Sequence, residues 1–441
     1  MSDHERRMTP LKGRKVTVIG LGRFGGGIGV TRFLAAQGAR VVVSDKAPAG
    51  ELEQSIKALE GLDVTLHLGG HLEEDFLGCD LLVVNPAVPK DMPLLAAAAR
   101  AGVEMTTEIN LFLERCSAQT VGITGSVGKS TTTAMIGEIL RRQFVTHVGG
   151  NIGKSLLEEL PSIQPEHVVV LELSSFQLED VVQVKISPHI AVVTNLIPNH
   201  LDRHGNMEAY GDAKKSIYRF QGPDDVLVLN SADPVSGVWA AEAPGKVVYF
   251  DGSGEGDFEL PLPGRHNQAN AQAAWQTVRQ LGIDIDTTRA ALKRFSGLPH
   301  RLQFVAEKDS IRYFNDSKCT TPQGAVVAVN SFEPRKAIMI VGGYDKHVSF
   351  DEMAVVLAQR AKAVVAIGAT ARQIVDALEQ HRTGDQPAVA RADDLAAAVA
   401  AARKFAAAGD AVLLSPACAS YDMFTNYEQR GEAFCELVRA M

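Results

Sequence analysis

The most constraining feature of the sequence is a glycine-rich loop between a strand-like and a helix-like segment. Thr124-Gly125-Ser126-Val127-Gly128-Lys129-Ser130 follows the β-branched stretch Thr120–Thr124 and precedes the helix-like stretch Thr131–Ile136. A loop in this context wraps phosphates with backbone N–H groups, while its Lys meets the β- and γ-phosphates and its Ser ligates Mg²⁺. The position five before Gly128 is Ile123, so the loop departs from the strict phosphate-loop pattern. The context still predicts a phosphate-binding enzyme.

Short β-branched stretches alternate with helix-like stretches along three segments of the chain. This alternation is typical of parallel α/β units, and 441 residues suffice for several domains. Helical patterns give way to Ser or Gly-Pro turns near Cys116 and Gly297-Leu298-Pro299. We therefore predict an α/β fold with three domains, residues 1–116, 117–298 and 299–441. The main strand-like stretches are 15–20, 40–45, 80–84, 120–124, 168–172, 189–194, 337–341, 363–367 and 411–414, and an Ala-rich helix is expected over 395–408.

The composition argues against several classes of protein. The content of 46% hydrophobic and 22% charged residues is that of a globular protein in water, and no apolar run approaches the roughly 18 residues of a membrane span. A net charge of −8 argues against nucleic acid or an anionic membrane as the main partner. The first residues lack an apolar signal region, and five scattered cysteines without a CxxC pair indicate reduced thiols. We expect a cytoplasmic protein.

A second glycine-rich loop, Gly20-Leu21-Gly22-Arg23-Phe24-Gly25, follows the first strand-like stretch. Its glycines would let backbone N–H groups approach a pyrophosphate at a helix N-terminus. Asp45, about twenty residues further on, could accept a hydrogen bond from a ribose or base. The pattern fits NAD as well as UDP, so the nucleotide remains open. The continuing run Gly25-Gly26-Gly27-Ile28-Gly29 suggests a wider loop than the pattern requires.

Candidate metal ligands lie at the ends of two other strands. Glu172 ends the apolar stretch Val168–Leu171, and His200 and Asp202 follow the next strand. Ligands of open α/β sheets bind at the carboxyl ends of the strands. A carboxylate and an imidazole there suit Mg²⁺ or Mn²⁺ when phosphate oxygens and water complete the coordination.

Taken together, these blocks resemble the Mur ligase family, and within it the branch that adds D-glutamate. The resemblance extends from Val16 to the C-terminus. The blocks that carry it most specifically are Gly149–Gly153, Glu172–Leu178, Asn199-His200-Leu201-Asp202-Arg203, Gly264–Asn270, Leu298-Pro299-His300-Arg301, Asn315-Asp316-Ser317-Lys318-Cys319-Thr320 and Ser415-Pro416-Ala417-Cys418-Ala419-Ser420.

The resemblance implies an N-terminal Rossmann-like domain for UDP, a central P-loop ATPase with a mostly parallel sheet, and a C-terminal Rossmann-like domain for the amino acid. It also implies the reaction. ATP phosphorylates the carboxylate of UDP-N-acetylmuramoyl-L-alanine, the amine of D-glutamate attacks the acyl phosphate, and phosphate leaves. The expected cofactors are ATP and Mg²⁺, with two ions, and the expected state is a monomer. A carboxylate is a poor electrophile, so a phosphoryl leaving group is chemically sensible, and catalysis depends on positioning and charge neutralisation.

The resemblance also assigns residues by motif. Those for ATP are Gly125, Ser126, Gly128, Lys129, Ser130, Thr131, Asn270, Arg301 and Asp316. Those for metal are Ser130, Glu172, His200 and Lys214, the last of which falls where the family carries a carbamylated lysine. Lys129, Glu172, His200 and Lys214 are the catalytic set. Those for the UDP-linked substrate are Gly22, Asp45, Lys46, Asn85, Asn151, Ser174 and His300, and those for D-glutamate are Lys318, Thr320, Lys346, Ser420 and Tyr427.

The chain departs from the family pattern at three places. Asn199 replaces the usual acidic residue before the metal histidine, and Val127 stands where Asn is common. Asn85-Pro86-Ala87-Val88-Pro89 replaces the usual Ser-Pro-Gly turn. These changes indicate a divergent branch and not a lost activity; the altered turn, with the extra glycines of the first loop, concerns the UDP contacts more than the chemistry.

Three other functions explain the sequence less completely. A folate-type polyglutamate synthetase does not explain the first nucleotide loop or the Asp316-Ser317-Lys318 block. An NAD-dependent oxidoreductase leaves the phosphate loop unexplained. A non-catalytic regulator would be expected to have lost Lys129, Glu172 or His200, all of which are present.

Overall fold

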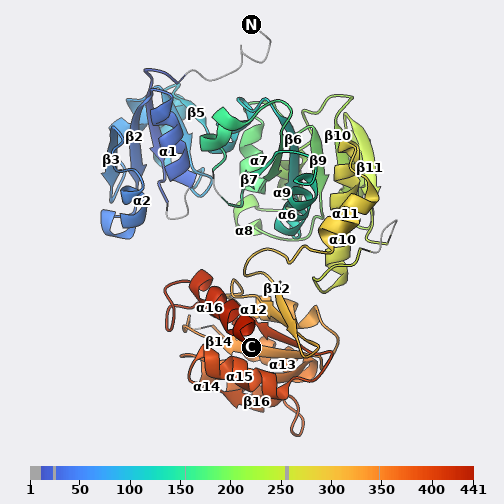
Figure 1. Ribbon diagram of the computed structural model, residues 1–441. Coiled ribbons are helices and arrows are strands. Elements are labelled where there is room, and N and C mark those ends of the chain that lie inside the picture. The colour runs from blue at the N-terminus through green and yellow to red at the C-terminus, as the bar shows by residue number, and fades with distance from the viewer. Residues whose placement is uncertain (1–10, 23–25, 154, 254–257, 347) are drawn as a thin grey trace. The chain divides into compact units, whose positions relative to one another are not determined.

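The computed structural model describes residues 11–22, 26–153, 155–253, 258–346 and 348–441 (Figure 1). The chain divides into two compact units. The first comprises the described residues of Met1–Asp257 with Ala269–Thr288, and the second comprises Phe258–Gln268 with Arg289–Met441. Two sheets belong to the first unit and one to the second.

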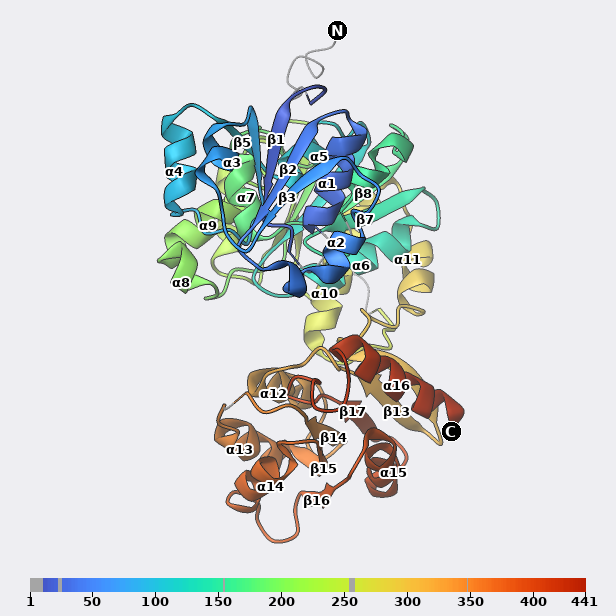
Figure 2. The same cartoon turned by 90° about the vertical axis from the view of Figure 1, so that its left-hand side faces the viewer.

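The N-terminal sheet has five parallel strands in the order β3-β2-β1-β4-β5 (Figure 2). The direction of strand addition reverses between β1 and β4. The loops after these two strands therefore flank a crevice, the usual ligand position in such sheets. The strands are β1 (Lys15–Ile19), β2 (Arg40–Asp45), β3 (Val64–Leu68), β4 (Leu81–Val84) and β5 (Glu104–Thr106), and the helices are α1 (Gly26–Ala36), α2 (Glu53–Lys57), α3 (Glu73–Leu77), α4 (Pro93–Arg100) and α5 (Glu108–Leu113), with a 3₁₀ turn at Ala49–Glu51.

The central sheet has six parallel strands in the order β11-β10-β9-β6-β8-β7. Its inner strands are apolar runs because both faces are covered; β8, Val-Val-Val-Leu-Glu, is buried at every position. The strands are β6 (Gln119–Thr124), β7 (Thr146–Gly150), β8 (Val168–Glu172), β9 (Ile190–Val193), β10 (Val226–Asn230) and β11 (Lys246–Phe250), and the helices are α6 (Lys129–Leu140), α7 (Ser175–Val181), α8 (Leu201–His204), α9 (Met207–Lys215), α10 (Arg265–Val278) and α11 (Ile285–Leu292), with 3₁₀ turns at Leu157–Ser162, Ser236–Glu242 and Arg279–Leu281.

The C-terminal sheet has the order β12-β13-β17-β14-β15-β16, and only the β12–β13 pair is antiparallel. Separate apolar clusters form on its two faces, one with α12, α13 and α14 and the other with α15 and α16. The strands are β12 (Gln303–Lys308), β13 (Ile311–Asn315), β14 (Ala337–Gly342), β15 (Ala361–Ile367), β16 (Ala388–Arg391) and β17 (Ala411–Leu414), and the helices are α12 (Pro322–Asn330), α13 (Asp351–Arg360), α14 (Ala371–Glu379), α15 (Leu395–Phe405) and α16 (Tyr427–Ala440).

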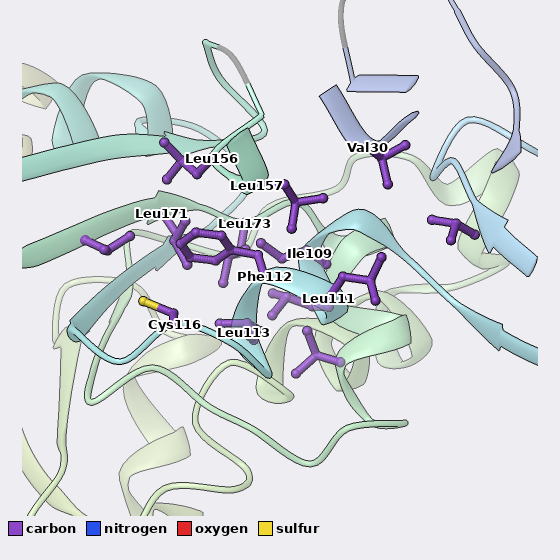
Figure 3. Close-up of a cluster of buried hydrophobic side chains, with 14 of the residues drawn as sticks. Val30, Ile109, Leu111, Phe112, Leu113, Cys116, Leu156, Leu157, Leu171 and Leu173 are labelled. Atoms are coloured by element: carbon purple, nitrogen blue, oxygen red, sulfur yellow. The ribbon is translucent and has the colours of Figure 1, made fainter. Parts of the chain in front are cut away.

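Helix α5 joins the first two sheets through a shared core (Figure 3). Ile109, Leu111, Phe112 and Leu113 are all buried, and they belong to one apolar cluster that contains side chains of both sheets. In Figure 3 they lie between Val30 of α1 and the central-sheet leucines such as Leu171. This continuous apolar cluster, shared by both sheets, explains why the first two sheets form one compact unit.

The mixed α/β architecture with three mostly parallel sheets confirms the predicted fold class. The Ala-rich helix is confirmed as α15, which contacts the sheet and ends at Phe405. All five cysteines are buried and free. Among the described residues, none of the helices combines the length and apolarity that a membrane crossing needs. The domain boundaries at 116/117 and 298/299 remain predictions.

Candidate functional site

The phosphate loop lies at the carboxyl end of β6, at the point where strand addition in the central sheet reverses direction. Gly128 has φ +86° and directly precedes α6, which begins at Lys129. Gly125 has φ +146°, and a Cβ there would lie 1.9 Å from Oγ1 of Thr194. A Cβ on Gly128 would lie 2.5 Å from Oδ1 of Asn270, whose side chain accepts a hydrogen bond from Thr132. Both glycines are therefore required by conformation and by space.

The segment after β9 fixes the shape of this loop. Asn195 accepts from the backbone N–H of Val127 (3.0 Å) and donates to its carbonyl oxygen (3.0 Å). Thr194 donates to the same carbonyl oxygen (2.7 Å). Ser126 donates its hydroxyl to the Ile197 carbonyl and accepts from the Ile197 N–H. The Val127 side chain, at the position where the family often has Asn, is 54% exposed, so the backbone contacts define the loop.

Two lysine ammonium groups converge on the phosphate loop. Nζ of Lys129 donates to the carbonyl oxygens of Gly125 (3.0 Å) and Ser126 (3.1 Å). Nζ of Lys214, from the last turn of α9, donates to Gly125 O (2.8 Å) and to Thr124 Oγ1 (3.3 Å), and lies over the Tyr210 ring. Lys214 is 1% exposed. Burial, followed by the charge of Lys129, lowers the pKa of Lys214 to about 7, although Glu172 opposes the shift.

Glu172 ends β8 beside this loop and has one unsatisfied oxygen. Its side chain is buried, Oε1 accepts from Nδ2 of Asn151 (2.8 Å), and Oε2 is buried without a hydrogen-bond partner. A buried, unpaired carboxylate oxygen is costly unless a cation or donor reaches it. Ser130 stands in the first turn of α6, as a metal-ligating phosphate-loop serine does. Among the described residues, no cluster of three or more His, Cys, Asp or Glu could hold a metal by itself.

His200 precedes α8 in the left-handed conformation, with φ +52°. Its ring packs edge-on to Phe176, 5.1 Å between centroids, and Phe176 also stacks on His204. The neighbouring Asn199 uses its side-chain oxygen to accept from the His200 N–H, so the residue that departs from the family pattern supports the turn. Burial lowers the pKa of His204, which bonds to Ser175 and Glu179.

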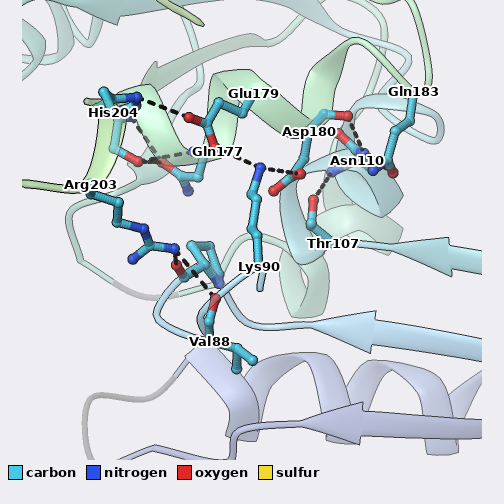
Figure 4. Close-up of polar contacts among 12 residues, drawn as sticks. Val88, Lys90, Thr107, Asn110, Gln177, Glu179, Asp180, Gln183, Arg203 and His204 are labelled. Carbon is cyan, nitrogen blue, oxygen red and sulfur yellow. Dashed lines mark hydrogen bonds and ion pairs between the residues drawn. The ribbon is translucent and has the colours of Figure 1, made fainter. Parts of the chain in front are cut away.

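Polar contacts connect the central sheet's loops to the loop after β4 (Figure 4). Arg203 donates to the carbonyl oxygens of Pro86 (2.9 Å) and Val88 (3.3 Å), and its guanidinium lies 4.3 Å from the Phe176 ring centroid. Lys90 pairs with Glu179 (2.7 Å) and Asp180 (2.8 Å). The rim of the N-terminal crevice is thereby held against the helices that follow β8 and β9.

A pocket of about 480 Å³ lies at the N-terminal sheet between the loops after β1, β2 and β4. Gly20 lines it together with Gly22, Asp45, Lys46 and Asn85, the residues for which a role at the UDP-linked substrate is predicted; Gly25 of the same motif lies outside the described residues. Asp45 uses Oδ2 to accept from the Gly22 N–H (3.0 Å) and Oδ1 to accept from Ala47 (2.8 Å). Its carboxylate therefore shapes the loop.

The expectation of a wider first loop is wrong for the glycines that are described. Gly26, Gly27 and Gly29 lie in α1. A Cβ on Gly27 would lie 2.2 Å from the Leu21 carbonyl oxygen, and one on Gly29 would lie 2.4 Å from Cβ of Ser155. Close packing, not loop width, requires these glycines.

Asn315 ends β13 and Asp316 follows it, at the carboxyl edge of the C-terminal sheet. Asp316 accepts from the Leu302 N–H (3.1 Å) and from the Ser415 hydroxyl (2.7 Å), and burial raises its pKa to about 6. The amide of Asn315 lies 3.0 Å from Nδ1 of His300, a residue whose pKa is lowered by burial. Arg301 is exposed beside them.

Of the predicted D-glutamate residues, Lys318, Thr320, Lys346 and Ser420 lie on loops of the C-terminal unit, and Tyr427 begins α16. Lys318 places Nζ 5.4 Å from the Tyr427 ring centroid, and burial raises the pKa of Tyr427 to about 12. Lys346 donates to the Thr320 carbonyl oxygen (3.4 Å). Thr320 and Lys346 line a pocket of about 490 Å³. Ser420 lies in the loop after β17 and is buried.

The structure thus brings Lys214, Glu172 and Asn151 to the phosphate loop that contains Lys129. Ser126 and Ser130 belong to the same loop, and Thr131 and Asn270 lie beside it. Ser174 caps α7 through a reciprocal bond with Gln177, which gives it a structural task of its own. Sequence reasoning missed Thr194, Asn195, Tyr210 and His71. The first two stand directly after a buried strand, a signal that could have found them; His71 lines the N-terminal pocket and is held by Ser44 (2.9 Å).

Comparisons with known proteins agree with this layout. Residues 14–107 match the model of the Mur ligase MurD-like N-terminal domain, residues 123–255 the Mur ligase middle domain, and residues 300–418 the Mur ligase glutamate ligase domain. A UDP-N-acetylmuramoylalanine–D-glutamate ligase of Symbiobacterium thermophilum is 42% identical over 97% of this chain and 98% of its own length. One from Roseiflexus sp. is 39% identical over 98% and 99%.

Solved structures share the fold at lower identity. The UDP-N-acetylmuramate-alanine ligase from Thermotoga maritima has a TM-score of 0.58 at 20% identity, over 97% of this chain and 99% of that one. A MurF structure from Acinetobacter baumannii has a TM-score of 0.57 at 19% identity, over 99% and 93%.

Proposed function

The chain belongs to the Mur ligase family, and we propose that it joins D-glutamate to UDP-N-acetylmuramoyl-L-alanine at the expense of ATP, in the cytoplasm, as a monomer. The names of the relatives at 42% and 39% identity support the choice of substrates. The observation that carries the chemistry is the convergence of Lys129, Lys214 and Glu172 on the phosphate loop.

The reaction that fits this loop begins with phosphoryl transfer. A carboxylate oxygen of the L-alanyl group attacks the γ-phosphorus of ATP, and ADP leaves with the electrons of the broken P–O bond. The amine of D-glutamate then attacks the acyl carbon, loses a proton, and phosphate departs to leave the amide. Backbone N–H groups of residues 128–130, at the start of α6, and the charge of Lys129 would stabilise the transferring phosphoryl group.

The residues present fit a divalent metal. Glu172 offers a buried oxygen without a partner, and Ser130 offers a hydroxyl at the start of α6. We assign these two to Mg²⁺, with His200 for a second ion. Bound Mg²⁺ would neutralise phosphate charge and polarise the P–O bonds.

Lys214 is proposed to carry a carbamate. Its Nζ would attack CO₂ to form an N–C bond with release of a proton, a reaction that requires the neutral amine. The lowered pKa, about 7, keeps a large part of the side chain neutral near physiological pH. The modification would replace a buried cation beside Lys129 with an anion that can face a metal ion.

The remaining predicted roles follow the three sheets. We assign the pocket with Gly22, Asp45, Lys46 and Asn85 to the UDP moiety, and Asn151, Ser174 and His300 to the acyl end. Asn270, Arg301 and Asp316 are assigned to ATP. The D-glutamate residues are Lys318, Thr320, Lys346, Ser420 and Tyr427, and the domains are residues 1–116, 117–298 and 299–441.

The test is phosphate release from ATP, with each substrate omitted in turn. We expect release only when UDP-N-acetylmuramoyl-L-alanine and D-glutamate are both present, with a product heavier by one glutamyl residue in mass spectrometry. K129M, purified in parallel, controls for contaminating ATPases. Release that requires a different amino acid would overturn the substrate assignment, and ATP-independent product would overturn the mechanism.

A further inference from the structure

Arg430, the fourth residue of α16, has 0% exposure and is the largest fully buried side chain among the described residues. Arginine is rarely buried completely unless its charge is paired. Among the described residues, its hydrogen bonds go to carbonyl and hydroxyl oxygens and none goes to a carboxylate. Burial lowers the pKa of Arg430 to about 10, so the group remains charged at neutral pH.

The guanidinium bonds to two separate segments. Nε donates to Oγ of Ser317 (3.0 Å), and Nη2 donates to the carbonyl oxygen of the same residue (2.8 Å). Nη2 also donates to the Cys418 carbonyl (3.0 Å), and Nη1 donates to the Ala419 carbonyl (3.2 Å). The loop after β13 and the loop after β17 are therefore held by one planar group, whose rigid fork suits several acceptors at fixed positions.

A third segment joins through Ala419. The Tyr344 N–H donates to the Ala419 carbonyl (2.9 Å), the oxygen that Arg430 also reaches. Gly343 has φ +151°, and a Cβ there would lie 2.4 Å from this oxygen and 3.2 Å from Nη1 of Arg430. The loop after β14 thus packs directly on the arginine and its acceptor.

These bonded positions lie within three residues of every residue assigned to D-glutamate. Ser317 precedes Lys318 and lies three residues before Thr320, and Ala419 precedes Ser420. Tyr344 lies two residues before Lys346, and Tyr427 lies one turn before Arg430 on α16, where its carbonyl accepts from the Ser317 hydroxyl (2.8 Å).

We propose that Arg430 is a positioning residue for the amino-acid substrate: it fixes the three loops that carry the D-glutamate contacts, without touching the substrate itself. The inference rests on the proposed function, because it takes the glutamate residues from there. Small displacements of binding groups reduce affinity and rate strongly, so a buried clamp on three loops acts on substrate recognition.

The test is steady-state kinetics of R430K, with each substrate varied. Lysine keeps the charge but cannot reach four acceptors in a plane. We expect the KM for D-glutamate to rise about tenfold, while the KM values for ATP and for the UDP-linked substrate change by less than about twofold. The matched control is R335K: Arg335 in the same unit also donates to two backbone carbonyls, of Ala361 and Ala358, far in sequence from the three loops. R335K is expected to leave all three KM values unchanged.

S317A provides a second variant if R430K does not fold, since it removes one acceptor and leaves the charge in place. Its expected effect is a rise of about threefold in the KM for D-glutamate. K346M tests the proposed glutamate pocket separately from the proposed role of Arg430. A raised KM in K346M with a normal KM in R430K and S317A overturns the role of Arg430. A normal KM in K346M overturns the glutamate pocket itself, and the role of Arg430 with it.

Discussion

The two glycine-rich loops differ in what their side chains contribute. Both follow a central strand of a parallel sheet at a reversal of strand order, and both lead into a helix. The phosphate loop after β6 has two lysine ammonium groups on its carbonyl oxygens. The loop after β1 is instead held by the Asp45 carboxylate, which accepts from the Gly22 N–H. Similar backbone patterns thus carry different side-chain partners, which fits the two roles proposed for them: neutralising phosphate at the first of these loops and holding the UDP moiety at the second.

The largest expected effect comes from removing the phosphate-loop cation. K129M should lower kcat/KM about a thousandfold, because a preorganised charge on the transferring phosphoryl group is lost. The fold should be retained, as judged by circular dichroism. K12M, a change of a lysine outside both loops, serves as the control. If K129M kept more than a tenth of the activity, the lysine charge would not be what distinguishes the phosphate loop from the loop after β1.

G125A should reduce activity about a hundredfold and lower the free energy of unfolding by about 2–4 kcal/mol. The added Cβ would lie 1.9 Å from Oγ1 of Thr194, and φ is +146°. Activity assays and urea denaturation measure both effects. The double variant G125A/T194A removes the clashing oxygen and should recover part of the stability; no recovery would refute the steric explanation.

The pH dependence of activity should reflect Lys214. Its pKa is lowered from 10.5 to about 7, so the neutral amine that a carbamate requires is present above pH 7 and is lost as the pH falls below it. Between pH 8 and pH 6 the neutral fraction falls about tenfold, and activity in bicarbonate should follow. A carbamate carbon signal with ¹³C-bicarbonate, absent in K214M but present in K215M, is the measurement. An unchanged rate down to pH 6 would contradict it.

At the first loop, D45N should raise the KM for the UDP-linked substrate about fivefold and leave the KM for ATP unchanged. An amide has one acceptor oxygen, whereas Asp45 accepts from both Gly22 and Ala47. In D45N, the N–H of Gly22 or of Ala47 would lose its acceptor, and the loop after β1 would be held less firmly. D91N, a change of an exposed residue at the same pocket, is the control. Equal effects of both variants would show that charge alone matters.

The smallest effect is expected from G22A, the counterpart of G125A. No atom lies within 4 Å of a Cβ at Gly22, so only the φ of +65° opposes the change. The expected loss is about 1 kcal/mol of unfolding free energy, with about a twofold rise in KM for the UDP-linked substrate. A loss as large as that of G125A would show that the two loops are equally constrained.

Local patterns predicted much of the fold. Inner strands such as β1, β2, β8 and β17 are rich in apolar residues, and each was predicted within a residue of its bounds. Strands such as β3, β7, β12 and β16 were missed, because they lie at or near sheet edges and alternate or mix polar residues. The phosphate loop was found because glycine and lysine at fixed spacing report backbone geometry directly.

The sequence by itself determined the α/β class, the phosphate loop and the strand-end position of Glu172, since each depends on a few neighbouring residues. Only the tertiary structure decided which distant groups meet: Lys214 on the Gly125 carbonyl, Asn195 on Val127, and Arg430 between the loops at Ser317 and Ala419. It also decided that Gly27 and Gly29 serve packing and not a wide loop. The physical reason is that burial, pKa and hydrogen-bond partners are set by residues far apart in the chain, and no local pattern contains them.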